Sequence, residues 1–309
     1  MPDIVKTQQN QQISPAQRNM FFNQLTRQHI QAGPSVAFVE GQTVSIEVPK
    51  ARLLSKILLK IEGTINFTHA ADATVAMLPN APFGFIRKVE VNLNNGFSPY
   101  VVTGEDLLAL NLIQGNGNMV SPVVSTNVLT LASRAKNRIG NSADTVANGG
   151  VDNIMQMIVE LPLTLNDRDP AGLIMLQAPD VLVNINVTFG NVLSNILSAT
   201  ANAGATFTNG RITPIYETFS IPAQEQARPD LSILKLVHSR TENIAAAGIK
   251  TINISTGYMY RKLLVWLKDA NGAGITDDAL NTNFDIVLNT ADRPYSIPHD
   301  VIAERNQQA

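Results

Sequence analysis

The sequence predicts a mainly β protein of two tandem antiparallel jelly-roll β-sandwiches, with a short N-terminal helix and one helix inserted in each unit. Three observations support this fold class. Short segments that alternate apolar and polar residues recur along most of the chain. Long polar segments separate them, as is typical of sandwiches and jelly rolls. The chain also matches itself, in the same order, in its two halves.

The order of these signals divides the 309 residues into four parts. They are an N-terminal arm and helix (1–34), a first jelly roll (35–222), a linker (223–230) and a second jelly roll (231–309). Pro222 and Pro229 flank a polar stretch, which is why the linker is placed there.

The N-terminal helix is predicted from Pro15 to Gln31. Ser14-Pro15 is a typical helix start, and Gly33-Pro34 ends the segment. The residues that would form its functional side are Arg18, Phe21, Phe22, Leu25, Arg27 and His29. Two interpretations stay open: the helix could lie on an anionic membrane surface, or it could pack beneath its own domain or a neighbouring subunit.

Period-two alternation predicts the strands of both units. Those of the first unit are Val44–Val48, Leu53–Phe67, Phe85–Leu93, Ile154–Leu163, Leu173–Gln177, Val181–Phe189 and Ile212–Ile221. Those of the second are Ile233–Val237, Ile249–Ser255, Tyr258–Leu267 and Phe284–Leu288, followed by a helix from about Pro298. Asn94-Asn95-Gly96 is a hairpin signal. Ser133–Asn153 and Asn195–Gly210 are interpreted as long loops.

The internal match consists of three short segments in the same order. Arg87–Leu93 matches Arg261–Leu267 at an offset of 174 residues (261 − 87). Pro99-Tyr100 matches Pro294-Tyr295 at an offset of 195 (294 − 99), and Asp106–Ala109 matches Asp300–Ala303 at 194 (300 − 106). The residues that define the repeat are Arg87, Lys88, Pro99, Tyr100, Asp106, Arg261, Lys262, Pro294, Tyr295 and Asp300.

Each copy places an Asp in the first turn of the helix that follows, where the exposed N–H groups favour negative charge. Thr103 and Asp106 form a capping box for the first of these helices. The shared order favours duplication; the alternative is that β proteins reuse the same strand–turn–strand pattern. After Ala303 the second copy has six residues left, whereas a jelly roll needs eight strands. We therefore expect the natural chain to continue for about 40–50 residues.

Composition argues against an enzyme. Charged residues make up 16% of the chain and the net charge is −2, so no basic field would attract nucleic acid. The absence of cysteine excludes disulfides, thiolate metal sites and a cysteine nucleophile. The four histidines form no HExxH motif, and there is no GxSxG or Walker motif. Asp167 and Asp169 are interpreted as a solvated turn rather than a cation site. We expect no catalytic, cofactor-binding or metal-binding residues.

The order of features resembles the double jelly-roll major capsid proteins of the tectivirus family, the tailless membrane-containing phages, and within it those infecting Gram-positive bacilli. The resemblance covers nearly the whole chain. It includes the Gln-rich N-terminus, the short helix, the linker at 224–230, and the Tyr258–Leu267 segment that leads into Asp269-Ala270-Asn271-Gly272.

The resemblance implies a trimer with a pseudo-hexameric outline in an icosahedral shell around an internal membrane. It implies N-terminal helices beneath the trimer near that membrane, loops that form outer towers, and contacts with minor capsid and vertex proteins. No signal peptide or apolar run of about 18 residues is present, so we expect synthesis in the host cytoplasm and a final location in the virion.

Two other functions remain as alternatives. A carbohydrate-binding or adhesin-type jelly roll would need exposed aromatic residues on loops, and aromatic residues are only 6% of the chain. A cupin-type β-barrel enzyme would need clustered His and Glu in strands, whereas the histidines of this chain are scattered.

Overall fold

The computed structural model describes most of the chain in two compact units, Met1–Thr251 and Ile252–Ala309. The described residues are 14–68, 74–78, 80–94, 96–113, 138–139, 145–165, 171–177, 180–197, 204–224, 227–244, 248–265, 267, 283–288, 292–298 and 300–302. Each unit is considered by itself.

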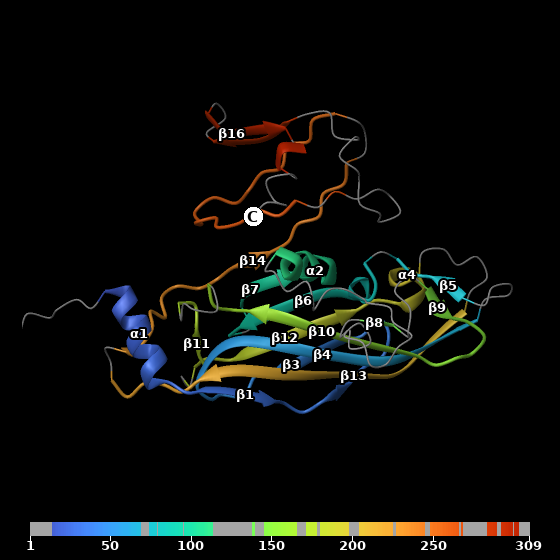
Figure 1. The fold of residues 1–309 in the computed structure, drawn as a ribbon, viewed down its shortest axis with the longest axis horizontal. Coiled ribbons are helices and arrows are strands. Elements are labelled where there is room, and N and C mark those ends of the chain that lie inside the picture. The colour runs from blue at the N-terminus through green and yellow to red at the C-terminus, as the bar shows by residue number, and fades with distance from the viewer. Residues whose placement is uncertain are drawn as a thin grey trace, which may run out of the picture. The chain divides into compact units, whose positions relative to one another are not determined.

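The first unit consists mainly of two antiparallel sheets (Figure 1). Sheet A contains β1 (Gln28–Ala32), β2 (Val36–Ala37), β4 (Leu53–Thr68), β8 (Arg138–Ile139), β10 (Asn153–Pro162), β11 (Ile174–Met175) and β13 (Gly204–Phe219). Sheet B contains β3 (Thr43–Glu47), β6 (Ile86–Leu93), β7 (Phe97–Val102), β12 (Val183–Phe189) and β14 (Val237–His238). A small ribbon joins β5 (Thr74–Ala76) to β9 (Thr145–Ala147).

The helices of this unit are short. They are α1 (Pro15–Leu25), the 3₁₀ turn η1 (Phe83–Phe85), α2 (Gly104–Ile113) and α4 (Val192–Asn195). In the second unit the described strands are β15 (Asn283–Leu288) and β16 (Asp292–Pro298), which pair as an antiparallel hairpin, and residues 300–302 are helical.

The strand order confirms a jelly roll in the first unit. In sheet A the first strand of the chain (β1 with β2) pairs with the last (β13), which pairs with β4 and then β10. In sheet B the order is β3, β12, β6, β7. Apart from the hairpin β6–β7, the long strands therefore alternate between the two sheets along the chain, in the pattern of two interlocked Greek keys.

The core lies between the two sheets because alternate side chains of their long strands point inward. The central strand β4 buries every second residue from Ile57 to Phe67, and β12 does the same from Val183 to Phe189. Four phenylalanines close one part of this core: Phe38 stacks on Phe189 with ring centroids 3.7 Å apart, and Phe85 and Phe207 pack beside them. Burial of such large side chains is the main stabilising contribution.

The structure corrects three predictions about elements. The N-terminal helix ends at Leu25 rather than Gln31, because Thr26 caps the carbonyl of Phe22 and β1 then pairs with the edge of β13. The strand predicted from Ile212 begins at Gly204, so part of the expected loop Asn195–Gly210 is strand.

The third correction concerns residues 231–309, which the sequence predicts as the second jelly roll. Residues 249–255 and 258–265 form no strand, although both segments were predicted to do so, and of Ile233–Val237 only Val237 lies in a strand. A strand needs hydrogen-bonded neighbours as well as a suitable sequence. Among the described residues of the second unit, only the β15–β16 pair provides them.

Candidate assembly surfaces

Helix α1 packs against the end of its own unit where β13 finishes (Figure 1). Ser14 caps it in a capping box: the backbone N–H of Gln17 donates to the Ser14 hydroxyl at 3.3 Å, and the backbone N–H of Ser14 donates to the side-chain oxygen of Gln17 at 3.2 Å. Phe22 is 1% exposed against Leu53, Leu173 and Phe219. Among the side chains of the helix that the structure describes, Phe22 is the buried one and docks the helix.

The other residues predicted for this helix have different environments. Arg18 is half-buried, and Leu25 is 46% exposed. Arg27 follows the helix, and its main chain bonds to Ser220. His29 lies in β1 opposite Thr218, so it is a strand residue rather than part of a helical face. Phe21 lies within the helix, but its side chain is outside the described part of the structure.

Each unit contains a hairpin with the same strand register. In the first, Val91 opposes Tyr100 and Leu93 opposes Phe97, with a register shift between the two pairs. In the second, Ile286 opposes Tyr295 and Leu288 opposes Asp292, with the same shift at the same place. Each residue of the second hairpin lies 195 residues after its counterpart in the first (286 − 91, 295 − 100, 288 − 93, 292 − 97). The hairpins β6–β7 and β15–β16 are thus the same motif at the same register.

This register changes part of the predicted repeat. Pro99-Tyr100 and Pro294-Tyr295 occupy equivalent positions in β7 and β16, as expected. Lys88 lies in β6, and its structural equivalent 195 residues later (283 − 88) is Asn283 at the start of β15, not Lys262. The position equivalent to Arg87 lies outside the described residues. Arg261 and Lys262 are exposed and lie outside any strand. This part of the sequence match is wrong because the two Arg-Lys segments are alike locally, whereas the true equivalence depends on strand pairing, which the match does not see.

The helices that follow the two hairpins also begin alike. Asp106 accepts hydrogen bonds from the Thr103 hydroxyl at 2.6 Å and the Thr103 amide at 2.8 Å, which confirms the predicted cap of α2. Asp300 lies at the start of the helical residues 300–302, where its carboxylate accepts from the Val301 amide at 2.8 Å. A carboxylate is stabilised in such a first turn.

Matching side chains are covered to very different extents in the two hairpins. Val91 is 0% and Tyr100 1% exposed, and burial raises the pKa of the Tyr100 phenol, whose hydroxyl is buried without a hydrogen-bond partner. Their equivalents Ile286 and Tyr295 are only partly buried. The same face that forms core in the first unit is therefore accessible in the second.

A carboxylate at one equivalent position joins the strands of each hairpin. Glu90 accepts hydrogen bonds from Lys88 at 2.7 Å and Ser98 at 2.5 Å. Asp285, which is 195 residues later (285 − 90), accepts from Ser296 at 2.6 Å and Arg293 at 3.3 Å. The hydrogen bonds from Lys88 and Ser98 hold the pKa of Glu90 below the usual range of a glutamate.

We expect Glu90→Gln to weaken the dependence of stability on acid pH. Because the pKa of Glu90 is depressed in the folded state, its contribution is present above the unfolded pKa and is lost as pH falls through the folded value. Urea midpoints measured from pH 7 down to pH 3 should therefore fall less steeply in the variant. Equal slopes for the variant and the parent protein would contradict this role.

Strand β14 covers part of the edge of sheet B. Val237 and His238 run parallel to Tyr100 and Val101 of β7, and the Ser239 amide donates to the Val101 carbonyl at 3.0 Å. A ring nitrogen of His238 lies 2.9 Å from the Ser98 carbonyl oxygen. The chain beyond the predicted linker thus first protects an edge of the first unit.

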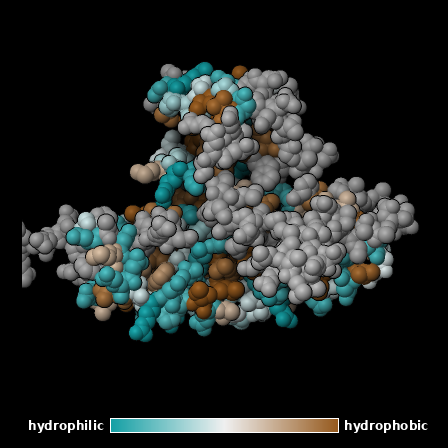
Figure 2. All heavy atoms as spheres, in the orientation of Figure 1, coloured by the Kyte–Doolittle hydropathy of each residue, from teal (hydrophilic) through white to brown (hydrophobic). Residues whose placement is uncertain are grey.

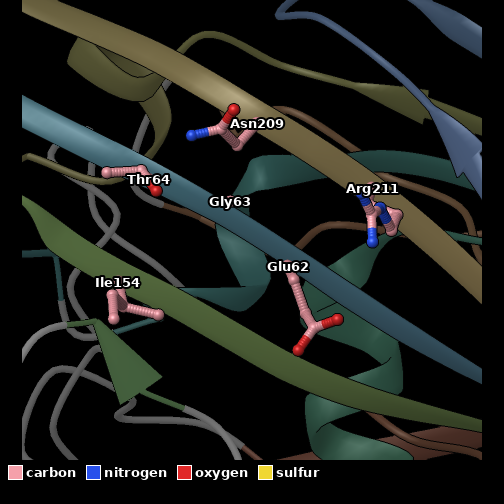
Figure 3. A pocket seen from close by; sticks show the side chains of 6 residues that line it. All are labelled: Glu62, Gly63, Thr64, Ile154, Asn209 and Arg211. Carbon is pink, nitrogen blue, oxygen red and sulfur yellow. The ribbon is translucent and has the colours of Figure 1, made fainter.

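A shallow pocket opens on the outer face of sheet A, lined by Glu62, Gly63, Thr64, Ile154, Asn209 and Arg211 (Figure 3). Glu62 and Arg211 are cross-strand neighbours on β4 and β13. The lining contains no aromatic side chain on which a sugar could stack, and one carboxylate beside a guanidinium makes no acid–base pair. The pocket supports neither of the two alternative functions.

Within the described ranges, no group of three or more His, Asp or Glu side chains could hold a metal ion. The same ranges contain no helix that is long and apolar enough to cross a membrane. Asp167 and Asp169 lie outside the described residues, as do Asp269–Gly272 and most of the segment 114–144, so those predictions remain predictions.

Comparison with known proteins gives distant structural likenesses. No family model matches the chain, and no curated protein matches it. The atomic structure of Sulfolobus turreted icosahedral virus matches with a TM-score of 0.44 and 14% identity over 64% of this chain and 47% of the other. The mavirus major capsid protein gives 0.35 and 12% over 72% and 51%, and the Faustovirus major capsid protein 0.34 and 11% over 65% and 55%. The chain spans about half the length of the structures it matches.

Proposed function

We propose that the chain is a major capsid protein, a shell subunit whose activity is assembly. The observation that carries this proposal is the second copy of the β6–β7 hairpin at the same register. A chain with two related units presents two similar surfaces, so three copies can form a ring with a pseudo-hexameric outline.

The exposed surface of the second unit supports assembly. Large apolar side chains are 41–92% exposed there, which is unfavourable unless a partner covers them. They are Ile252, Ile254, Tyr258, Met259, Tyr260, Leu263, Leu264, Val265, Val287, Leu288 and Val301. A two-stranded hairpin is not stable alone in water, so this unit needs further strands or a neighbour.

The finer parts of the proposal follow the resemblance to membrane-containing phages. In it, residues 35–222 and 231–309 form two jelly rolls joined by a linker at 223–230, and the trimer belongs to an icosahedral shell around an internal membrane. Minor capsid and vertex proteins are further partners, and the virion is the final location. Helix α1 supplies the contact with the membrane or with a neighbouring subunit.

Native mass spectrometry of the natural protein tests the proposal most directly. We expect a species of three times the subunit mass at micromolar concentration, because obligate interfaces bury about 2,000 Å² or more. A strict monomer at that concentration would contradict the proposed function.

Deletion of residues 1–26 tests the role of α1. The cut leaves β1 paired with β13, so we expect the first unit to stay folded while particle assembly, or binding to anionic vesicles, is lost. Deletion of residues 1–13, which keeps the whole helix, is the matched control. Normal assembly after the longer deletion would refute a role for α1.

A further inference from the structure

The outer face of sheet A has an aliphatic centre. Side chains on this face alternate with those that enter the core, and three large aliphatic ones lie at its centre: Leu58 of β4, Ile158 of β10 and Ile215 of β13. Leu58 and Ile215 are direct cross-strand partners, and Ile158 lies opposite Lys60, one outward position further along β4. All three are partly exposed.

Figure 2 shows this face, with hydrophobic side chains gathered in the middle over β4 and β13 and hydrophilic ones beside them. Ile30 and Ile154 extend the aliphatic surface and are 66% and 60% exposed. Cross-strand rows place Ile30 beside Glu217, and Ile154 opposite Thr64.

Sheet B has no such centre on its three neighbouring strands β3, β12 and β6. The outward positions of β3, β12 and β6 are Thr43, Ser45, Glu47, Asn184, Asn186, Thr188, Lys88, Glu90 and Asn92. Antiparallel sheets that face water on one side normally show such a polar outer face. The aliphatic centre therefore distinguishes the outer face of sheet A from these strands of sheet B.

The charges around the aliphatic centre balance. Three basic and three acidic side chains surround it: Lys56, Lys60, Arg211, Glu62, Glu160 and Glu217. Lys56 pairs with Glu160, and Lys60 with Glu62 at 2.7 Å. A face of this kind has an apolar core and a polar, neutral rim, which is the composition of a protein interface. It would attract neither nucleic acid nor an anionic membrane.

We propose that this outer face of sheet A, centred on Leu58, Ile158 and Ile215, binds a second copy of the chain. The inference rests on the proposed assembly function and identifies the surface that carries it. A second copy fits because a neutral face does not repel a subunit whose net charge is only −2, and because the chain itself carries exposed apolar side chains in its second unit. In a closed ring each copy offers this face to a different surface of the next copy.

The 309 residues contain no cysteine, so single-cysteine variants of the protein allow a direct test. Ile215→Cys places a thiol at the centre of the face. Asn186→Cys places one at an outward, partly exposed position of sheet B and is the matched control. Maleimide labelling rates are measured for each variant in the oligomeric fraction and in monomer obtained by dilution, with thermal unfolding to verify the fold.

We expect Ile215→Cys to react about tenfold or more slowly in the oligomer than Asn186→Cys, and the two to react at similar rates in the monomer. Equal rates in the oligomer would overturn the inference while leaving the assembly function intact. Slow reaction of Ile215→Cys in the monomer would also overturn it, because the cover would then come from the same chain. Absence of any oligomer would defeat the assembly function itself.

A second variant gives an independent measurement. Ile215→Lys puts an unpaired charge at the centre of the face, and we expect it to weaken association about a hundredfold, whereas Asn186→Lys should leave association unchanged. Both variants should keep the parental unfolding midpoint, since neither position belongs to the core. Undiminished association of Ile215→Lys would contradict the proposed interface.

Discussion

Gly104→Ala is expected to destabilise the first unit by about 3 kcal/mol. Gly104 is buried at the start of α2, where that helix meets η1. A Cβ atom there would lie 2.0 Å from the carbonyl oxygen of Phe83 and 3.0 Å from that of Ile86. Both contacts are with backbone, so no side-chain rotation can relieve them.

The measurement is a denaturant titration followed by circular dichroism, and Gly96→Ala is the matched control. Gly96 lies in the turn of the β6–β7 hairpin, and the nearest atom to its Cβ position is 3.8 Å away. We expect the control to change the free energy of unfolding by less than about 1 kcal/mol. A Gly104→Ala protein as stable as the control would show that α2 can shift away from η1 at little cost.

Phe22→Ala is expected to undock α1, at a cost of about 3 kcal/mol for the local contact. The ring of Phe22 is almost fully covered and lies 5.4 Å from that of Phe219. An isolated helix of 11 residues is marginal in water, so loss of this anchor should unfold the helix as well.

Hydrogen exchange across residues 15–25 measures the effect directly. We expect protection to be lost in Phe22→Ala and retained in Met20→Ala, whose side chain is 48% exposed. The rest of the first unit should keep its protection in both variants. Retained protection of α1 in Phe22→Ala would mean that the capping box and main-chain contacts hold the helix without the ring.

The same variant tests whether α1 must be docked on its own unit for assembly. If assembly requires a docked α1, Phe22→Ala and the deletion of residues 1–26 should impair it equally. If assembly requires only exposed apolar side chains such as Met20 and Leu25, Phe22→Ala should retain more activity than the deletion.

Several elements could be predicted from the sequence because their signals are local. The alternation from Leu53 to Phe67 gave β4 to within one residue at each end. Ser14-Pro15 predicted the start of α1, and Thr103 with Asp106 predicted the cap of α2. In each case the residues that form the signal also make the interaction, so no distant partner is involved.

The missed features depend on partners far away in the sequence. His29 fits a helical periodicity, but the segment that contains it forms a strand because it pairs with the edge of β13, some 190 residues later. Arg261–Leu267 has the pattern of a strand and lacks one, since alternation alone provides no hydrogen-bonded neighbour. Leu58, Ile158 and Ile215 are separated by up to 157 residues (215 − 58) and meet only through strand register.

The sequence by itself determined a mainly β chain with a jelly roll, a capped N-terminal helix and a duplicated Pro-Tyr hairpin. Propensity, alternation and capping are all local, so they can be recognised without coordinates. Only the tertiary structure decided which segments pair, and therefore that β15, rather than Arg261–Leu267, is the second copy of β6. It also decided that the outer face of sheet A has an aliphatic centre, because strand register alone brings those side chains together.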